Sequence, residues 1–105
     1  KIIMKSLNIP KSFQLFGTTV EVVWDNKRMN DLNSYGLYEY SKNRITLSDL
    51  DGVELLSEDR MKDCFYHECV HAILEAMWER DLSKNEKFVD TFAKLMRQMN
   101  ETKQY

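Results

Sequence analysis

The chain has 105 residues, of which 43% are hydrophobic and 30% are charged, with only three glycines and one proline. This composition is typical of one globular domain, residues 1–105, and excludes a disordered chain. The net charge is −2 and no basic run is present, so we expect no nucleic-acid partner. Residues 1–10 lack the apolar core of a signal peptide and no stretch approaches a membrane span, which predicts a cytoplasmic protein without a membrane partner.

The first part of the chain carries a strand pattern. Apolar and polar residues alternate between residues 13 and 25, and Gly17-Thr18 can form a turn. This segment predicts a β-hairpin. The polar residues 26–34, rich in Asn and Asp, predict a loop with one helical turn around Met29.

The same alternation returns further along the chain. Residues 35–40 and 44–47 predict two strands, and the polar residues 41–43 between them predict a turn. A second hairpin is therefore expected. Residues 48–56 contain two aspartates and a glycine and predict a loop that leads into the helical half of the chain.

The segment after residue 56 predicts a long helix. Ser57 is suited to the N-cap because two acidic residues follow it, and residues 60–79 contain neither Gly nor Pro. Apolar side chains surround nearly the whole helix, which is the pattern of a buried helix. Cys64 and Cys69 lie on different sides of it, so we expect free thiols and no disulfide between them.

The only two histidines of the chain lie on this helix. His67 and His71 stand four residues apart, and Glu68 follows the first, which makes an H-E-x-x-H motif. Residues four apart project from the same face of a helix, so both imidazoles can bind one metal ion. In metallopeptidases with this motif, the glutamate takes a proton from the water that the metal holds. The motif predicts one Zn²⁺ ion as cofactor and Glu68 as the catalytic residue.

A second helix is predicted from Lys84 to Asn100, after a turn at residues 81–83. Its apolar stripe would pack on the first helix, and its first turns contain two carboxylates, Glu86 and Asp90. Catalytic zinc takes about three protein ligands and keeps one position open for water. With both histidines used, the third ligand must come from Asp, Glu or Cys, and the spacing alone leaves Glu86 and Asp90 as alternatives.

The length of the first helix affects this choice. A helix that continues to Arg80 extends about 13 Å beyond His71, and a tightly antiparallel partner would then place Asp90 opposite the histidines. Glu86 can face them if the first helix ends earlier or if the two helices cross steeply. Ser83 and Glu86 also match a capping box, in which Glu86 would bind the backbone of Ser83 and not a metal.

Together these motifs resemble those of gluzincin metallopeptidases of the thermolysin type, in their small ImmA/IrrE-like branch. The resemblance covers residues 13–99 and rests on H-E-x-x-H at 67–71, N-E-x-x-x-D at 85–90, and the hairpin residues 36–38 and 45–47. It implies that Glu86 is the third zinc ligand. It also implies that Asp90 accepts a hydrogen bond from the outer ring nitrogen of a histidine, preferably His67. Val89 departs from that branch, which has an alanine there.

We therefore expect an α+β fold of the minimal zincin type. A small antiparallel sheet from two hairpins would pack on the central H-E-x-x-H helix, and a C-terminal helix would complete the metal site. The predicted function is zinc-dependent hydrolysis of a protein or peptide substrate. Strand 44–47, if it is the sheet edge nearest the site, could pair with an extended substrate. By the resemblance, the protein would act in a bacterial host or phage-infected cell, where some relatives cut a repressor.

Two other functions are consistent with the same residues. A catalytically silent binding module stabilised by zinc would keep all three metal ligands. A metal-free helical interaction protein would carry the motif by accident. Metal content and the dependence of cleavage on Glu68 distinguish these functions from a peptidase.

Overall fold

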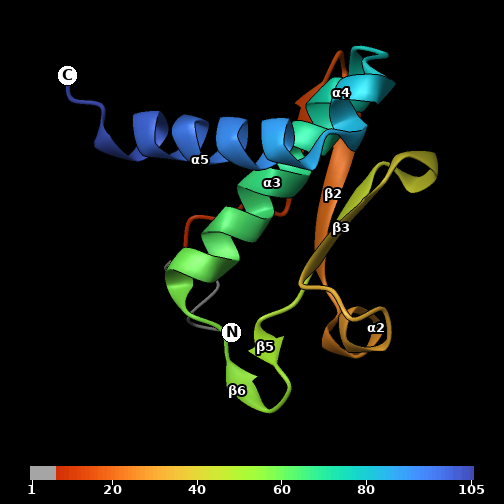
Figure 1. The fold of residues 1–105 in the computed structure, drawn as a ribbon, viewed down its shortest axis with the longest axis vertical. Coiled ribbons are helices and arrows are strands. Elements are labelled where there is room, and N and C mark those ends of the chain that lie inside the picture. The colour runs from red at the N-terminus through yellow and green to blue at the C-terminus, as the bar shows by residue number, and fades with distance from the viewer. Residues whose placement is uncertain (1–6) are drawn as a thin grey trace.

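The computed structural model describes residues 7–105, and residues 1–6, where the sequence predicts no regular element, lie outside the described part. The elements follow in the order β1 (Ser12–Leu15), β2 (Thr18–Trp24), α2 (Asn26–Asp31), β3 (Gly36–Glu39), the short 3₁₀ helix η1 (Tyr40–Lys42), β4 (Arg44–Leu47), β5 (Leu50–Asp51), β6 (Glu54–Leu55), α3 (Glu58–Ala76), α4 (Arg80–Lys84) and α5 (Glu86–Thr102). The strands come before the two long helices, which confirms the predicted α+β class (Figure 1).

Four strands form the main sheet in the order β1-β2-β4-β3. Both predicted hairpins are present, because β1 pairs with β2 and β3 pairs with β4, each antiparallel. The hairpins join through a parallel pair, β2 with β4, whose register sets Glu21 opposite Arg44 and Trp24 opposite Leu47. The sheet is therefore mixed, and the expectation of a purely antiparallel sheet is corrected. The crossover through α2 lays β3 on the outer side of β4 and makes the parallel pair.

The strand order also decides which strand is the sheet edge nearest the site. Residues 44–47 could pair with a substrate only as an edge strand, and they do not form one, because β4 has β2 on one side and β3 on the other. Its residues Ile45, Thr46 and Leu47 are buried, as expected of an interior strand. The edge strand next to the helices is β3, which contacts α3.

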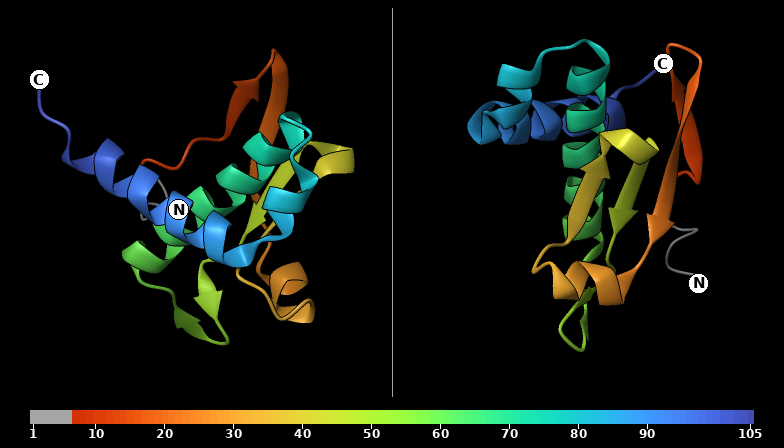
Figure 2. Two further views of the ribbon diagram at one scale, coloured as in Figure 1. Left: turned by 45° about the horizontal axis from the view of Figure 1, so that its top comes forward. Right: turned by 90° about the vertical axis from the view of Figure 1, so that its right-hand side faces the viewer.

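Helix α3 lies between the sheet and α5 (Figure 2). On one side, six apolar residues of the sheet and of α3 form a buried core: Val20, Val22, Ile45, Leu47, Phe65 and Cys69. On the other side, four residues of α3 and α5 form a smaller one: Val70, Leu74, Val89 and Ala93. The predicted burial of this helix is confirmed, because it is covered on two sides.

Helix α3 ends at Ala76, before the predicted limit. The backbone N–H of Glu79 donates to the carbonyl of Leu74 (2.9 Å), and the N–H of Trp78 donates to that of Glu75 (3.1 Å). These two bonds form a Schellman motif, which requires a left-handed residue just after the helix. Trp78 adopts that conformation, with φ of 62°.

The short helix α4 then leads into α5, whose N-cap is Asn85. The side-chain oxygen of Asn85 accepts a hydrogen bond from the N–H of Phe88 (3.1 Å), so Glu86 is the first residue of the helix. The capping-box interpretation is therefore wrong, because Ser83 lies buried in α4. Figure 2 shows α5 crossing α3 steeply. Both conditions that allow Glu86 to face the histidines are met.

Helix α5 buries less of its apolar stripe than the sequence pattern suggests. Val89 and Ala93 are buried, whereas Phe92, Leu95 and Met99 are exposed. The reason is that the C-terminal part of α5 extends past the body of the protein (Figure 1).

Cys64 and Cys69 are free thiols as predicted. None of the helices within residues 7–105 has the length and apolar character needed to cross a membrane.

Candidate metal centre

Three side chains converge where α5 crosses α3. His67 and His71 lie one turn apart on α3, and Glu86 opens α5. One potential ligand atom of each lies within 4.8 Å of the other two. Residues 7–105 contain no second group of three or more His, Cys, Asp or Glu side chains arranged in this way.

The distances between these side chains fit one coordinated ion. Nε2 of His67 lies 3.1 Å from Oε1 of Glu86, and Nε2 of His71 lies 3.5 Å from Oε2 of the same carboxylate. Ligand atoms at about 2.0–2.1 Å from a tetrahedral ion are about 3.3 Å apart. Two imidazoles and one carboxylate are also a known ligand set of catalytic zinc. Zinc therefore fits both the chemistry and the spacing of these residues.

The outer ring nitrogens of both histidines face oxygen atoms. A hydrogen bond of 2.9 Å joins Nδ1 of His71 to Oγ of Ser83, and Nδ1 of His67 lies 3.6 Å from Oδ1 of Asp90. A histidine that binds a metal through Nε2 carries its proton on Nδ1, which can donate to such an oxygen. Burial lowers the pKa of His71, which favours the neutral imidazole that metal binding requires.

Asp90 thus lies beside His67, but their 3.6 Å contact is longer than a hydrogen bond. The contact of Ser83 with His71 was not expected from the sequence. Nζ of Lys94 lies 3.0 Å from Oδ2 of Asp90, and this contact lowers the pKa of the Asp90 carboxyl. An ionised Asp90 can accept a hydrogen bond but cannot donate one. The sequence gives no signal for Ser83, because a serine after a helix is equally expected in a turn or a cap.

Glu68 points from α3 toward the edge strand β3. Its side chain is buried, with 8% of the residue exposed, and this burial raises the pKa of its carboxyl to about 7. Gly36 of β3 leaves space for it: a Cβ atom at Gly36 would lie 3.2 Å from Cγ of Glu68 and 3.3 Å from Cδ2 of Leu47. The missing side chain of Gly36 therefore lets the edge strand pass close to Glu68.

These residues open onto a cavity of about 500 Å³. Its lining combines the motif residues with β3 and its surroundings: Ser34, Gly36, Leu37, Tyr38, Tyr40, His67, Glu68, His71, Glu75, Ser83 and Glu86. The imidazoles and the Glu86 carboxylate thus border open space and are not sealed by hydrocarbon. A substrate could reach the candidate metal centre through this cleft between β3 and the helices.

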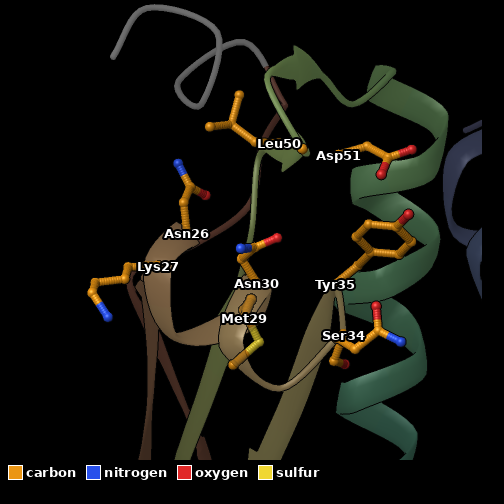
Figure 3. A pocket seen from close by; sticks show the side chains of 10 residues that line it. Asn26, Lys27, Met29, Asn30, Ser34, Tyr35, Leu50 and Asp51 are labelled. Atoms are coloured by element: carbon orange, nitrogen blue, oxygen red, sulfur yellow. The ribbon is translucent and has the colours of Figure 1, made fainter.

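A second cavity of about 500 Å³ lies beside α2 and β5 (Figure 3). Asn26 and Asn30 line it from α2, and Tyr35 and Asp51 line it from the opposite side. Ser34 belongs to the lining of both cavities. No residue of the candidate metal centre lines this second cavity, so its polar side chains cannot take part in chemistry at the histidines directly.

Comparison with known proteins identifies a family. A family model described as the SprT-like family matches residues 5–105, a range that includes both helices of the candidate metal centre. No curated protein and no solved structure matches the chain.

Proposed function

The chain belongs to the SprT-like family, and from that premise we propose that it is a zinc-dependent metallopeptidase that hydrolyses peptide bonds in proteins or peptides. The family is zincin-like, which agrees with the zincin type predicted from the sequence. The ImmA/IrrE-like branch is corrected, because the family model that matches is a different one. The observation that carries the proposal is the convergence of His67, His71 and Glu86 on one point.

We assign the metal ligands as Nε2 of His67, Nε2 of His71 and the carboxylate of Glu86. Ser83 and Asp90 lie at the outer nitrogens of the two rings and would hold the rings in the orientation that ligation needs. Bound there, zinc would lower the pKa of a water molecule to about 7 and polarise the carbonyl group of the scissile bond.

Glu68 is the proposed general base. It lines the same cavity as the two histidines, so its carboxylate can accept a proton from the attacking water and deliver it to the leaving amine. The close approach of Gly36 restricts the position of the Glu68 side chain. A defined position matters because proton transfer requires hydrogen-bond distance to the reacting atoms.

The substrate is proposed to bind as an extended segment along β3. An extended peptide can add to an edge strand as a further strand; on β3 the backbone N–H of Tyr38 already donates to the Glu68 carboxylate, so the peptide would pair with the remaining backbone groups. Strand β3 is the sheet edge on the side of the helices, and three of its residues line the cleft: Gly36, Leu37 and Tyr38. Cleavage of a repressor stays a prediction, since it rested on the ImmA/IrrE-like resemblance.

Metal analysis and one substitution test this function. The purified protein should contain about one zinc per chain, and it should cleave members of a peptide library. Glu68→Gln should keep the zinc and lower the cleavage rate by about 10²–10⁴-fold, the usual contribution of a general base. Glu79→Gln, an exposed glutamate outside the cleft, is the matched control and should cleave at the wild-type rate.

Three other results would contradict the proposal in different ways. Full activity of Glu68→Gln would exclude Glu68 as the base. A zinc-loaded wild type that cleaves no peptide would favour the zinc-stabilised binding module. Absence of zinc after reconstitution would exclude both metal-dependent functions.

A further inference from the structure

The cleft contains one acidic side chain that the proposed chemistry does not use. Glu75 lies on α3 one turn beyond His71, about 6 Å further along the helix axis, and lines the same cavity. Its side chain is 21% exposed. Among residues 7–105, the cationic side chain nearest the Glu75 carboxylate is that of Arg80, whose Nε lies 3.9 Å from Oε1.

This contact leaves the charge of Glu75 available. A paired arginine and carboxylate form two parallel hydrogen bonds of about 2.7–2.9 Å, whereas Arg80 approaches with one atom at 3.9 Å. The side chain of Arg80 is also 54% exposed, so it can move away without breaking a buried contact. The negative charge of Glu75 affects other side chains in the cavity. Tyr38 lines this cavity, and its pKa is raised first by burial and then by the charge of Glu75.

The position of Arg80 indicates that the cleft can hold a cationic side chain beside Glu75. Its guanidinium lies 5.0 Å from the ring centre of Trp78 and 5.9 Å from that of Tyr40, and Tyr40 lines the cavity beside Glu75. Aromatic faces together with a carboxylate are a common arrangement for recognising Lys and Arg side chains. The chain's own arginine therefore occupies the rim of a site suited to a cationic side chain.

A neighbouring cavity, which shares His67 and Glu68 with the cleft, differs in charge. This cavity, on the N-terminal side of His67, is lined by Arg60 and Lys94 as well as by Asp63 and Asp90. Asp90 contacts Lys94 at 3.0 Å, and Asp63 contacts Arg97 at 2.8 Å. These two aspartates are thus paired with cations at short range, while Glu75 is not.

We propose that Glu75 selects substrates that carry a Lys or Arg side chain next to the scissile bond, on the His71 side of the metal centre. The inference rests on the proposed peptidase function and adds to it a substrate class, basic peptides. The basic side chain of the substrate takes the place of Arg80 beside Glu75 and lies against the ring of Tyr40. Glu75 is then a specificity residue, and Glu68 remains the base.

The test compares peptides that differ in one residue beside the cleaved bond, with Lys, Arg, Gln or Glu at each position in turn. The readout is the ratio of kcat/KM for basic peptides to kcat/KM for the Gln peptides. Wild type should prefer the basic peptides. Glu75→Gln should lower the ratio about tenfold, which corresponds to about 1.4 kcal/mol, and Glu75→Lys should favour the Glu peptides. Glu79→Gln removes the same charge outside the cleft and should keep the wild-type ratio.

A second variant separates selection from a structural role through Arg80. If Glu75 acts only by holding Arg80, Arg80→Gln should reduce the ratio as Glu75→Gln does. Under the proposal, Arg80→Gln keeps the ratio at or above the wild-type value, because it removes a competing cation. A fall of the ratio in Arg80→Gln to the level of Glu75→Gln would overturn the inference.

Binding separates this inference from the peptidase function. Zinc-loaded Glu68→Gln should bind a fluorescent Lys peptide more tightly than the Gln peptide in anisotropy titrations, and adding Glu75→Gln should remove the difference. If wild type cleaves nothing but this binding difference exists, the peptidase function fails and Glu75 still selects basic segments. If wild type cleaves without preferring basic peptides, or binding shows no difference, the inference fails.

Discussion

Helix α3 is packed on two sides, and the two interfaces differ in chemical character. Apolar side chains form the interface with the sheet, whereas polar groups complete the interface with α5. The sheet side is held by buried hydrocarbon, with Ile45 and Leu47 of the central strand β4 packed near Phe65 of α3. The α5 side is thinner, since α5 buries only Val89 and Ala93. Hydrophobic burial contributes in proportion to area, so the sheet side should be the more stable one by itself.

Polar groups complete the α3–α5 interface. Arg97 of α5 donates to Asp59 (2.7 Å) and to Asp63 (2.8 Å) near the start of α3. The proposed metal ligand Glu86 lies at the start of α5. The Arg97 side chain is only 15% exposed, but its partners Asp63 and Asp59 are 37% and 86% exposed. Ion pairs open to solvent on one side contribute little to stability, so a bound metal would be the strongest tie across this interface. We therefore expect the sheet and α3 to hold together without zinc, and the docking of α5 to depend on the proposed metal.

The largest effect is expected from Ile45→Ala. Ile45 has no exposed surface, and truncation of such a residue costs about 2–5 kcal/mol of unfolding free energy. Urea denaturation should show this loss, while the folded fraction should still bind one zinc. Val89→Ala at the α5 interface is the comparison; at about 0.8 kcal/mol per buried CH₂ group it should cost about 1.6 kcal/mol, against about 2.4 kcal/mol for Ile45→Ala on the same scale. Equal losses of unfolding free energy at the two positions would contradict the expectation that the sheet side of α3 is the more stable one.

Removal of zinc should act mainly on α5. At free zinc of 100 times its dissociation constant, binding adds about 2.7 kcal/mol to the unfolding free energy, and a chelator should remove it. Hydrogen exchange should then become faster in α5, while amides of β2 and β4 stay protected. The variant His71→Ala should show the fast exchange of α5 with or without zinc. A uniform increase over the strands and α5 would mean that the metal stabilises the whole fold and not one interface.

Ser83→Ala should weaken zinc binding without removing a ligand. Ser83 Oγ holds Nδ1 of His71 at 2.9 Å, and loss of such a partner lowers metal affinity about 10–100-fold. Competition with a chelator measures the affinity. Asp90→Asn should have a smaller effect, because its oxygen lies 3.6 Å from Nδ1 of His67. Ser41→Ala, at an exposed serine of η1, should bind zinc as wild type does, and a similar loss there would exclude a specific role for Ser83.

Acid should loosen the sheet at its outer edge. Arg28 of α2 donates to both oxygens of Glu39 at the end of β3, at 2.6 and 2.8 Å, and this contact lowers the pKa of Glu39 from 4.5 to about 2. Because the folded pKa is the lower one, the contribution of Glu39 is full above pH 4.5 and disappears as the pH falls toward 2. The difference in unfolding free energy between wild type and Glu39→Gln should therefore shrink over this range. If the difference in unfolding free energy did not change with pH, the Arg28–Glu39 ion pair could not be its source.

Features that depend on neighbours along the chain could be predicted from the sequence. His67 and His71 share a face because residues four apart do so in any helix, and the Ser57 N-cap forms as expected, with its side chain 3.2 Å from the N–H of Arg60. The two hairpins follow from alternation and nearby turns. In each case the relevant residues lie within a few positions of one another.

Features that depend on distant segments could not be predicted in this way. The parallel pair sets Glu21 beside Arg44, and no local pattern specifies which strands of two hairpins become neighbours. Ser83 reaches His71 only because α4 folds back beside α3. Glu86 could be named from the resemblance, but its approach to the histidines depends on where α3 ends.

The end of α3 at Ala76 could not be predicted from the sequence. The residue at the left-handed position is Trp78, whereas the usual signal for a helix end is a glycine. An L-residue in this conformation costs about 1–2 kcal/mol, and glycine does not bear that cost. Trp78→Gly should therefore raise the unfolding free energy relative to Trp78→Ala by about 1 kcal/mol, measured by thermal or urea denaturation. Both variants lose the contact of the Trp78 ring with Arg80, so their difference isolates the backbone. Equal stability would mean that Trp78 is not strained, and the early end of α3 would then require another cause.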